Sequence, residues 1–333
     1  MRTKQLLGTV VVVTRLGITI PLAGVAGVGD EVARLGAAGY TDCWTAETAG
    51  SDAFAPIVAA ATQETMGFGT AIASVYARGP GLLAMQAATA ATIAPGRFTL
   101  GIGTSSKLMT EGWNATTFDR PVARTRDTVR FLRAALAGEK VSAEFETFAI
   151  RSFRLEAPPE VVPPIAVAAL RPAMLRMAGA EADGIVLNWL AARDVPMVVS
   201  TAYPDQEPGI VAARIFVCCS EDAGAVRAAA RRLVSTYLTV PTYEAFQRWL
   251  GRDALTSMWD AWKQGDRAGA TDAVPDSVVD ELILHGSIDA CVEQVKAYAA
   301  AGVTVPVVKL LGLGVDHDLD ATAIAFGEAW ARR

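Results

Sequence analysis

Eight short apolar runs recur along the chain, and stretches with helical start and stop signals separate them. The runs are nearly all apolar rather than alternating, as expected for strands that helices bury on both faces. This alternation predicts an α/β protein, a single closed (β/α)8 barrel over residues 1–333, with a doubly wound open sheet as the alternative. The expected strands are residues 16–21, 40–44, 66–74, 97–103, 165–170, 184–189, 214–219 and 305–314, with helices at 30–38, 53–63, 80–93 and 121–136.

Two segments interrupt this rhythm. Residues 139–160 alternate apolar and polar side chains, which predicts a hairpin inserted before the fifth strand. Residues 222–285 are too long for one crossover and are rich in aromatic residues. We expect a helical insertion near the barrel mouth, either a lid or a plain decoration that thickens the wall or builds a dimer contact.

Charge and composition exclude several classes of protein. Thirty basic and 35 acidic residues give a net charge of −5, which argues against a nucleic-acid binder and against attraction to an anionic membrane. The four cysteines show no zinc-ligand spacing, so we expect reduced thiols in a cytoplasmic protein. With only two histidines, no metal site is expected, and residues 316–318 (DHD) are interpreted as a helix cap. The apolar run at 6–13 is too short to span a bilayer; residues 1–15 are expected to be an edge extension or a start site placed too early.

Reactive groups of a (β/α)8 barrel stand at the carboxyl ends of its strands. Glu47 closes the apolar run CWTAE there, where a carboxylate can accept a hydrogen bond from a ring N–H or act as a base. The alternative is an ion pair with Arg78 or a helix cap. Trp44, Trp113 and Trp189 could provide flat walls for a ring system or belong to the core.

Two loops could hold a phosphate. The first is GIGTSS (101–106), in which glycines let backbone N–H groups approach an anion, although Ser106 replaces the third glycine of a dinucleotide motif. The second is ALRP (169–172), where a strand ends, Arg171 follows, and a helix begins at Pro172. No nucleophile elbow, P-loop or HExxH motif occurs, which leaves cofactor chemistry.

Taken together, several segments resemble the luciferase-like flavin and deazaflavin oxidoreductases, and among them the enzymes that use coenzyme F420, including methylenetetrahydromethanopterin reductases. The segments are GYTDCWTAETAGSDAF, GTAIASVYARGPGLLAMQAATAATIAPGRFTLGIGTSS, RPVARTRDTVRFLRAALAGE, ALRPAMLRMAGAEADGIVLNW and GSIDACVEQVKAYAAAGV. The resemblance covers residues 16–315 in order.

The resemblance implies a cofactor ring over the barrel mouth, with its phosphate near the fourth and fifth strands. Glu47 takes the place of an acidic ring contact, and Ala71 and Ile72 that of a bulge that backs the ring and holds a cis peptide bond in related enzymes. Ser74 would follow toward the ring or the phosphate. The residues implied on the phosphate side are Gly103, Thr104, Ser105, Ala168, Ala169, Leu170 and Arg171.

One departure from the family narrows the function. The related sugar-phosphate dehydrogenases place a histidine directly after the acidic residue and an acid on the loop after the fourth strand. Here these positions hold Thr48 and Ser106, so sugar-phosphate oxidation of that kind is not expected.

The sequence therefore predicts an F420-dependent oxidoreductase that moves a hydride between the deazaflavin and a small organic substrate. Glu47 is the first candidate for the catalytic proton donor, with Thr48 or a water behind it. The alternatives are an FMN-dependent luciferase-like monooxygenase and a non-catalytic cofactor-binding barrel. Trp, Tyr, Thr and Ser rather than Arg pairs are expected at the mouth, which favours an apolar or aromatic substrate. The resemblance also suggests a homodimer.

Overall fold

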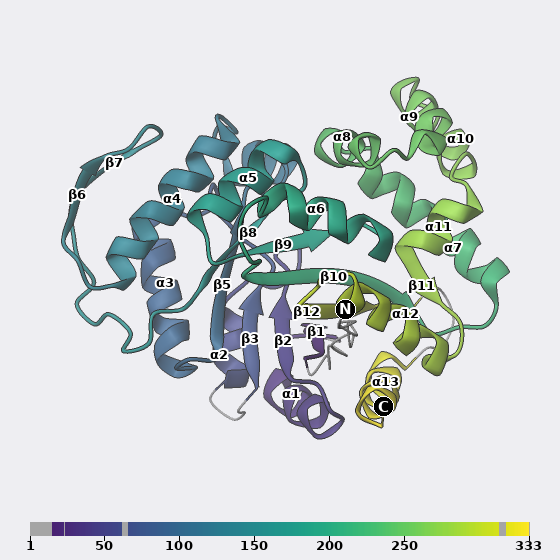
Figure 1. The fold of residues 1–333 in the computed structure, drawn as a ribbon, viewed down its shortest axis with the longest axis horizontal. Helices are drawn as coiled ribbons and strands as arrows, with labels where there is room; N and C mark the ends of the chain where they lie inside the picture. The colour runs from purple at the N-terminus through teal and green to yellow at the C-terminus, as the bar shows by residue number, and fades with distance from the viewer. Residues whose placement is uncertain (1–14, 23, 62–65, 313–317, 333) are drawn as a thin grey trace, which may run out of the picture.

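Eight parallel strands close into a barrel with helices around it (Figure 1). The computed structural model describes residues 15–22, 24–61, 66–312 and 318–332. Pairing of β12 with β1 and of β9 with β10 closes the ring, which confirms the barrel and excludes the open sheet. The barrel strands are β1 Gly17–Ile20, β2 Asp42–Thr45, β3 Gly67–Thr70, β5 Phe98–Gly103, β8 Ile165–Ala168, β9 Gly184–Asn188, β10 Ile210–Cys218 and β12 Val305–Leu310.

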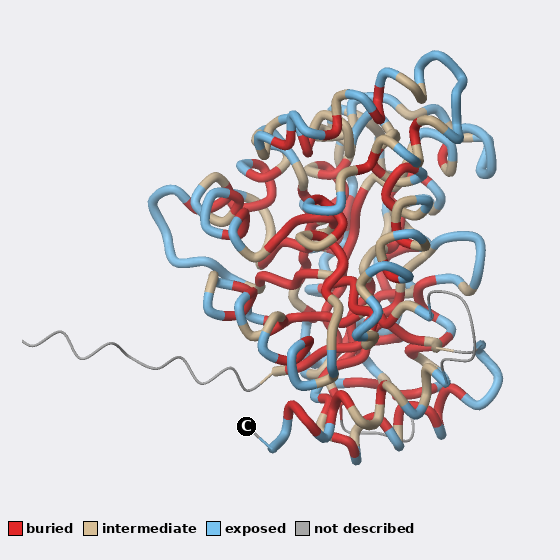
Figure 2. Tube along the Cα trace, turned by 90° about the vertical axis from the view of Figure 1, so that its right-hand side faces the viewer, coloured by how far each residue is buried: buried red, intermediate tan, exposed pale blue. Residues whose placement is uncertain are grey.

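Helices cover the outside of the barrel, and buried residues concentrate along the strands and the inner faces of these helices (Figure 2). The N-terminus of the last helix is capped by Asp318, whose side chain accepts a hydrogen bond from the N–H of Ala321 at 3.1 Å. The covering helices are α1 Val28–Ala37, α2 Ala55–Ala61, α3 Pro80–Ile93, α4 Pro121–Leu136, α5 Pro172–Glu181, α6 Val195–Ala202, α12 Ile288–Ala300 and α13 Leu319–Ala331, with short turns η1 Leu108–Trp113 and η2 Ala192–Asp194. Among the described residues, no helix is both long and apolar enough to cross a bilayer.

The expected strands are confirmed, with two main differences in detail. The third run is divided into β3 and a short strand β4, Ala73–Ser74, which pairs with β5. The seventh strand begins at Ile210 rather than 214, because Ile210–Arg214 pair with β9. Residues 1–14, the end of the second expected helix (62–63) and residues 313–317 lie outside the described residues.

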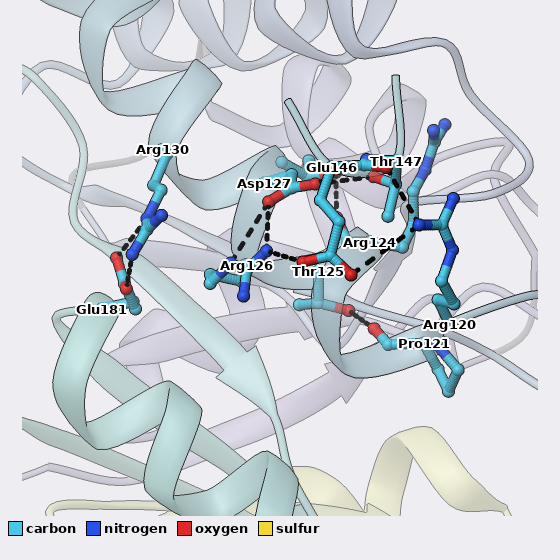
Figure 3. A network of polar contacts seen from close by, with 11 residues as sticks. Arg120, Pro121, Arg124, Thr125, Arg126, Asp127, Arg130, Glu146, Thr147 and Glu181 are labelled. Atoms are coloured by element: carbon cyan, nitrogen blue, oxygen red, sulfur yellow. Dashed lines mark hydrogen bonds and ion pairs between the residues drawn. The ribbon is translucent and has the colours of Figure 1, made fainter. Parts of the chain in front are cut away.

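The expected hairpin is present as β6 Val141–Glu144 and β7 Ala149–Phe153, paired antiparallel. Polar contacts fix its turn to α4 (Figure 3). The Asp127 carboxylate accepts hydrogen bonds from both the backbone N–H and the hydroxyl of Thr147, each at 2.9 Å, and Arg126 pairs with Glu146 at 2.6 Å. The hairpin is thus a fixed extension of α4 rather than part of the barrel.

The expected helical insertion follows β10 and has a core of its own, in which Val234, Leu238 and Trp259 are fully buried. It also contains a short strand, β11 Ile283–His285, which pairs in parallel with the end of β10 and was not expected. Arg252 joins the insertion to the barrel, because its buried guanidinium pairs with Asp194 at 2.6 Å and with Glu281 at 3.3 Å. The helical elements are α7 Ala223–Leu238, α8 Pro241–Trp249, η3 Asp253–Leu255, α9 Thr256–Lys263, α10 Arg267–Asp272 and α11 Asp276–Leu282.

A separate small cluster fills the inside of the barrel. Its largest member is Trp44, which packs with Val186, Ala212 and Val307 from other strands. The facing residue of β3 is Gly69, where a Cβ would lie only 2.4 Å from the indole of Trp44. Glycine is therefore required at this position so that the barrel can hold the tryptophan.

Candidate functional site

Glu47 lies directly after β2, where it joins two loops of the barrel mouth. Its carboxylate forms a bidentate ion pair with Arg78, with one Nη1–Oε2 distance of 2.6 Å. The same two oxygens accept hydrogen bonds from the backbone N–H groups of Ala53 and Ser74, each at 3.2 Å. The structure thus contains the ion pair that the sequence left open as the alternative for Glu47. Thr48, next to it, is exposed and makes no hydrogen bond to a described residue.

The bulge implied by the resemblance lies between β3 and β4. The Ala71–Ile72 peptide bond is cis, as the resemblance led us to expect. The Ile72 side chain approaches the end of β5, because a Cβ added at Gly103 would lie 3.1 Å from Ile72 Cγ1 and 2.9 Å from Ala168 Cβ. Three segments that are distant in sequence, the bulge, the end of β5 and the end of β8, therefore meet at one side of the mouth.

Ser74 follows the bulge and stabilises the turn into α3. Its hydroxyl oxygen accepts hydrogen bonds from the backbone N–H groups of Tyr76 and Ala77, each at 3.2 Å. Its own N–H donates to Glu47. Ser74 is 4% exposed, so its hydroxyl is held in one place beside the bulge.

The two candidate phosphate loops follow neighbouring strands, since β5 pairs with β8. The backbone N–H groups of Thr104, Ser105 and Ser106 make no hydrogen bond to a described residue. The same holds for Leu170 and Arg171, whereas the N–H of Ala169 donates to Val186. Free N–H groups beside the N-terminus of α5 are the donors that an anion needs.

Arg171 stands at the N-terminal end of α5 and is exposed, and its side chain makes no hydrogen bond or ion pair to any described residue. The alternative partner considered for it, Glu181, instead pairs with Arg130 on α4, with a distance of 3.0 Å from Nε to Oε2 (Figure 3). The Arg171 guanidinium therefore remains available to a ligand.

The three tryptophans considered as ring walls have different surroundings. Trp44 is buried inside the barrel and Trp113 is 53% exposed on η1. Trp189 is buried at the end of β9, where its ring lies 4.3 Å from that of Phe216 and 5.1 Å from that of Tyr237 on α7. The indole N–H groups of Trp44 and Trp189 are both buried without a hydrogen-bond partner among the described residues.

The helical insertion contributes directly to the rim near β9. The Asn188 side-chain amide donates to the hydroxyl of Tyr243 on α8 at 3.2 Å, and Gln247 donates to the backbone oxygen of Trp189 at 2.7 Å. Burial raises the pKa of Tyr243, so this hydroxyl keeps its proton. The insertion is thus attached to the end of a barrel strand.

Two charged residues that the sequence analysis did not single out face the barrel interior. Arg214 on β10 and Lys309 on β12 each lie two residues beyond a member of the interior cluster, Ala212 and Val307, and therefore on the same face of their strands. Burial lowers the pKa of both groups. The sequence did contain a signal for them, because both lie within or at the end of apolar runs expected to be strands. A charged side chain is unusual at such a position.

No group of His, Cys, Asp and Glu side chains suitable for a metal occurs among the described residues. None of the four cysteines is in a disulfide, and Cys43, Cys218 and Cys291 are buried. Asp318 caps α13 as expected for the DHD segment, while Asp316 and His317 lie outside the described residues.

Comparison with known proteins agrees with this geometry. A protein named as a coenzyme F420-dependent oxidoreductase from Mycobacterium tuberculosis is 26% identical over 81% of this chain and 87% of its own length. The F420-dependent tetrahydromethanopterin reductase of Methanopyrus kandleri has the same fold, with a TM-score of 0.78 and 19% identity over 96% of this chain and 99% of that one. The oxygenating constituent of 3,6-diketocamphane monooxygenase from Pseudomonas putida was solved in complex with FMN. It matches this chain with a TM-score of 0.63 and 18% identity, over 95% of this chain and 96% of that one. Residues 10–305 match the family described as luciferase-like monooxygenase, and the chain belongs to that family.

Proposed function

We propose that this protein is a coenzyme F420-dependent oxidoreductase that moves a hydride between the deazaflavin and a small organic substrate. The observation that carries the proposal is the meeting of the Ala71–Ile72 bulge with the ends of β5 and β8, whose loops present unbonded N–H groups. The relative and the solved structure that are named for F420 support this cofactor.

The residues present fit such a cofactor. A Cβ at Gly103 would lie 3.1 Å from Ile72 Cγ1 and 2.9 Å from Ala168 Cβ, so only glycine lets the bulge and the ends of β5 and β8 approach this closely at the side of the mouth where the ring would lie. The loops at 104–106 and 170–171, with Arg171, would hold the phosphate. When bound, the deazaflavin supplies the carbon that gives or accepts the hydride.

We assign Glu47 a positioning role rather than that of proton donor. Its two oxygens are each engaged by Arg78 and by a backbone N–H, so the carboxylate holds the bulge-side residue Ser74 and the start of α2 in place. Thr48 is exposed beside it, and its hydroxyl, or a water bound to it, remains our candidate for passing a proton to the substrate.

A titration with both cofactors tests the proposal. We expect the purified protein to bind F420 and to exchange hydride between F420 and an organic acceptor or donor, seen as a change in deazaflavin absorbance. Tight binding of FMN without binding of F420 would overturn it. Binding of F420 without turnover for any acceptor would instead support a cofactor-binding barrel without catalysis.

The family name and the neighbouring structure with FMN favour a second candidate, an FMN-dependent monooxygenase. Oxygen activation in such enzymes uses N5 of the flavin, which the deazaflavin replaces with carbon. Flavin-dependent oxygen consumption in the presence of an aldehyde would therefore support this second candidate against the first.

We further propose that the protein acts as a homodimer in the cytoplasm. Four cysteines without a disulfide support a reducing compartment. Light scattering on the purified protein tests the dimer, and a mass equal to one chain would contradict it.

A further inference from the structure

Two cations stand inside the barrel on neighbouring strands. β10 pairs with β12 in a register that places Arg214 beside Val307 and Phe216 beside Lys309. Because side chains alternate along a strand, Arg214, Phe216, Val307 and Lys309 all point to the same side of the sheet, the side of the interior cluster. The guanidinium of Arg214 lies over the ring of Phe216, 5.2 Å from its centre.

Neither cation has an anionic partner among the described residues. The Nε of Arg214 is buried without a hydrogen-bond partner, and the side chain forms no ion pair. Lys309 likewise makes no hydrogen bond or ion pair to a described residue. The charge of Arg214 acts on Lys309 and, together with burial, lowers its pKa. The charge of Glu31 acts on the pKa of Lys309 in the opposite direction, but no ion pair joins the two side chains, and the Glu31 oxygens accept hydrogen bonds from the N–H of Leu22 at 3.1 and 3.2 Å.

This arrangement contrasts with two other guanidinium groups that are largely removed from solvent. Arg252 is 3% exposed and is paired with Asp194 and Glu281. The side chain of Arg78 is 9% exposed and is paired with Glu47. A buried charge without a partner is costly, and natural folds retain one only where something else is gained. Arg214 and Lys309 are half-buried, and an anionic ligand would supply the partner that neither has among the described residues.

Several uncharged polar atoms around the two cations also have no hydrogen-bond partner in the described part of the chain. Asn188 lies opposite Arg214 in the register of β9 and β10, and its Oδ1 is buried without a partner while its Nδ2 donates to Tyr243. The hydroxyl of Thr19 and the indole N–H of Trp44, which are paired neighbours on β1 and β2, are buried and unpartnered as well. The interior near the mouth thus offers several donors and two positive charges, with apolar walls between them.

We propose that Arg214 and Lys309 bind an anionic oxygen group, a carboxylate or a phosphate, on an otherwise apolar or aromatic substrate. This inference rests on the proposed function, since it names the class of substrate for that oxidoreductase. It revises the expectation of a mouth without cationic pairs, because the two cations come from strand interiors rather than from loops. Asn188 and Tyr243 then stand beside the anion and link its binding to the helical insertion.

The test compares three probes of similar shape, benzoate, phenyl phosphate and benzamide, on the protein with F420 bound. We expect calorimetry to detect benzoate or phenyl phosphate, and affinity to fall by about tenfold or more in Arg214→Met and in Lys309→Met. The charge-preserving variants Arg214→Lys and Lys309→Arg should retain part of the affinity that the methionine variants lose. A preference for benzoate over phenyl phosphate identifies a carboxylate, and the reverse identifies a phosphate. Equal binding of benzamide would overturn the proposal.

Two further measurements separate this proposal from its competitors. If the cations merely stabilise the fold, both methionine variants should melt at a lower temperature; the proposal expects ligand-free variants that melt at the same or a higher temperature. Arg154 is exposed and makes no ion pair to a described residue, so Arg154→Met is the matched control. We expect it to change neither the affinity for the anionic probes nor the melting temperature.

F420 titrations on the same proteins complete the design. An equal loss of F420 affinity in the Arg214 and Lys309 variants would assign the cations to the cofactor and overturn the substrate proposal. Absence of F420 binding by the wild type would overturn the proposed function. In that case the same anionic probes are titrated against the protein without cofactor, and equal binding of benzamide there would overturn the anion proposal as well.

Discussion

The carboxylate of Glu47 and the guanidinium of Arg78 form a bidentate ion pair between residues 31 positions apart. Their side chains are 13% and 9% exposed, and Arg78 also donates to Gln86 at 2.8 Å and stacks over Phe54. The pair therefore ties the loop after β2 to the start of α3, on either side of the bulge. Its integrity decides how firmly the candidate cofactor site is held.

Glu47→Gln should destabilise the protein and loosen the site together. Removing one partner from a largely buried pair leaves the other charge uncompensated, which typically costs about 3 kcal/mol. We expect urea unfolding to show a loss of that order and F420 to bind more weakly. The exposed pair Arg34–Asp320, whose side chains are 51% and 41% exposed, provides the control. Arg34→Gln should cost much less stability, because solvent screens an exposed pair, and equal losses in both variants would contradict this account.

Gly103→Ala tests the meeting point of the bulge with β5 and β8. The new methyl group would lie 2.9 Å from Ala168 Cβ and 3.1 Å from Ile72 Cγ1, so these side chains have to move. We expect a stability loss of about 1–3 kcal/mol, typical of overpacking, and a decrease in F420 affinity of about tenfold. In Gly224→Ala the added methyl group makes only an ordinary contact at 3.4 Å, so both quantities should stay unchanged. An unchanged F420 affinity in Gly103→Ala would place the cofactor elsewhere.

The charge of Lys309 should make stability depend on pH. Burial, together with the charge of Arg214, lowers its pKa below the ordinary value of 10.5 in the folded state. Between the lowered pKa and 10.5 the unfolded chain binds more protons, so stability rises with pH in this interval. Lys309→Met should abolish that rise and be more stable than the wild type below the interval. Urea unfolding at a series of pH values measures the difference, and a constant difference would show that the charge is already compensated.

Much of the barrel could be predicted from the sequence because strands covered on both faces read as apolar runs. The same reasoning failed where a strand departed from that pattern. Arg214 was taken as the first residue of a strand, whereas four residues before it also pair with β9, which makes Arg214 an interior position. β11 was missed because a strand of three residues leaves almost no pattern.

The candidate site was harder to predict because its contacts join distant segments. The resemblance brought the bulge and both phosphate loops to attention, and the structure places these segments together. It could not decide whether Glu47 faced a ring or Arg78, since that depends on how two loops pack. Lys309 lies within an apolar run, and only the strand register shows that it and Arg214 face the same interior.

Arg171→Ala tests the proposed phosphate cradle. Arg171 is exposed at the N-terminal end of α5, and Glu181, which could have neutralised it, pairs with Arg130 instead. A charge-assisted hydrogen bond to phosphate contributes about 1.5–3 kcal/mol, so F420 affinity should fall by about ten- to a hundredfold while the melting temperature stays unchanged. A deazaflavin fragment that lacks the phosphate should bind the variant and the wild type equally. If the intact cofactor also binds both equally, the backbone N–H groups of the two loops and the N-terminus of α5 hold the phosphate without Arg171.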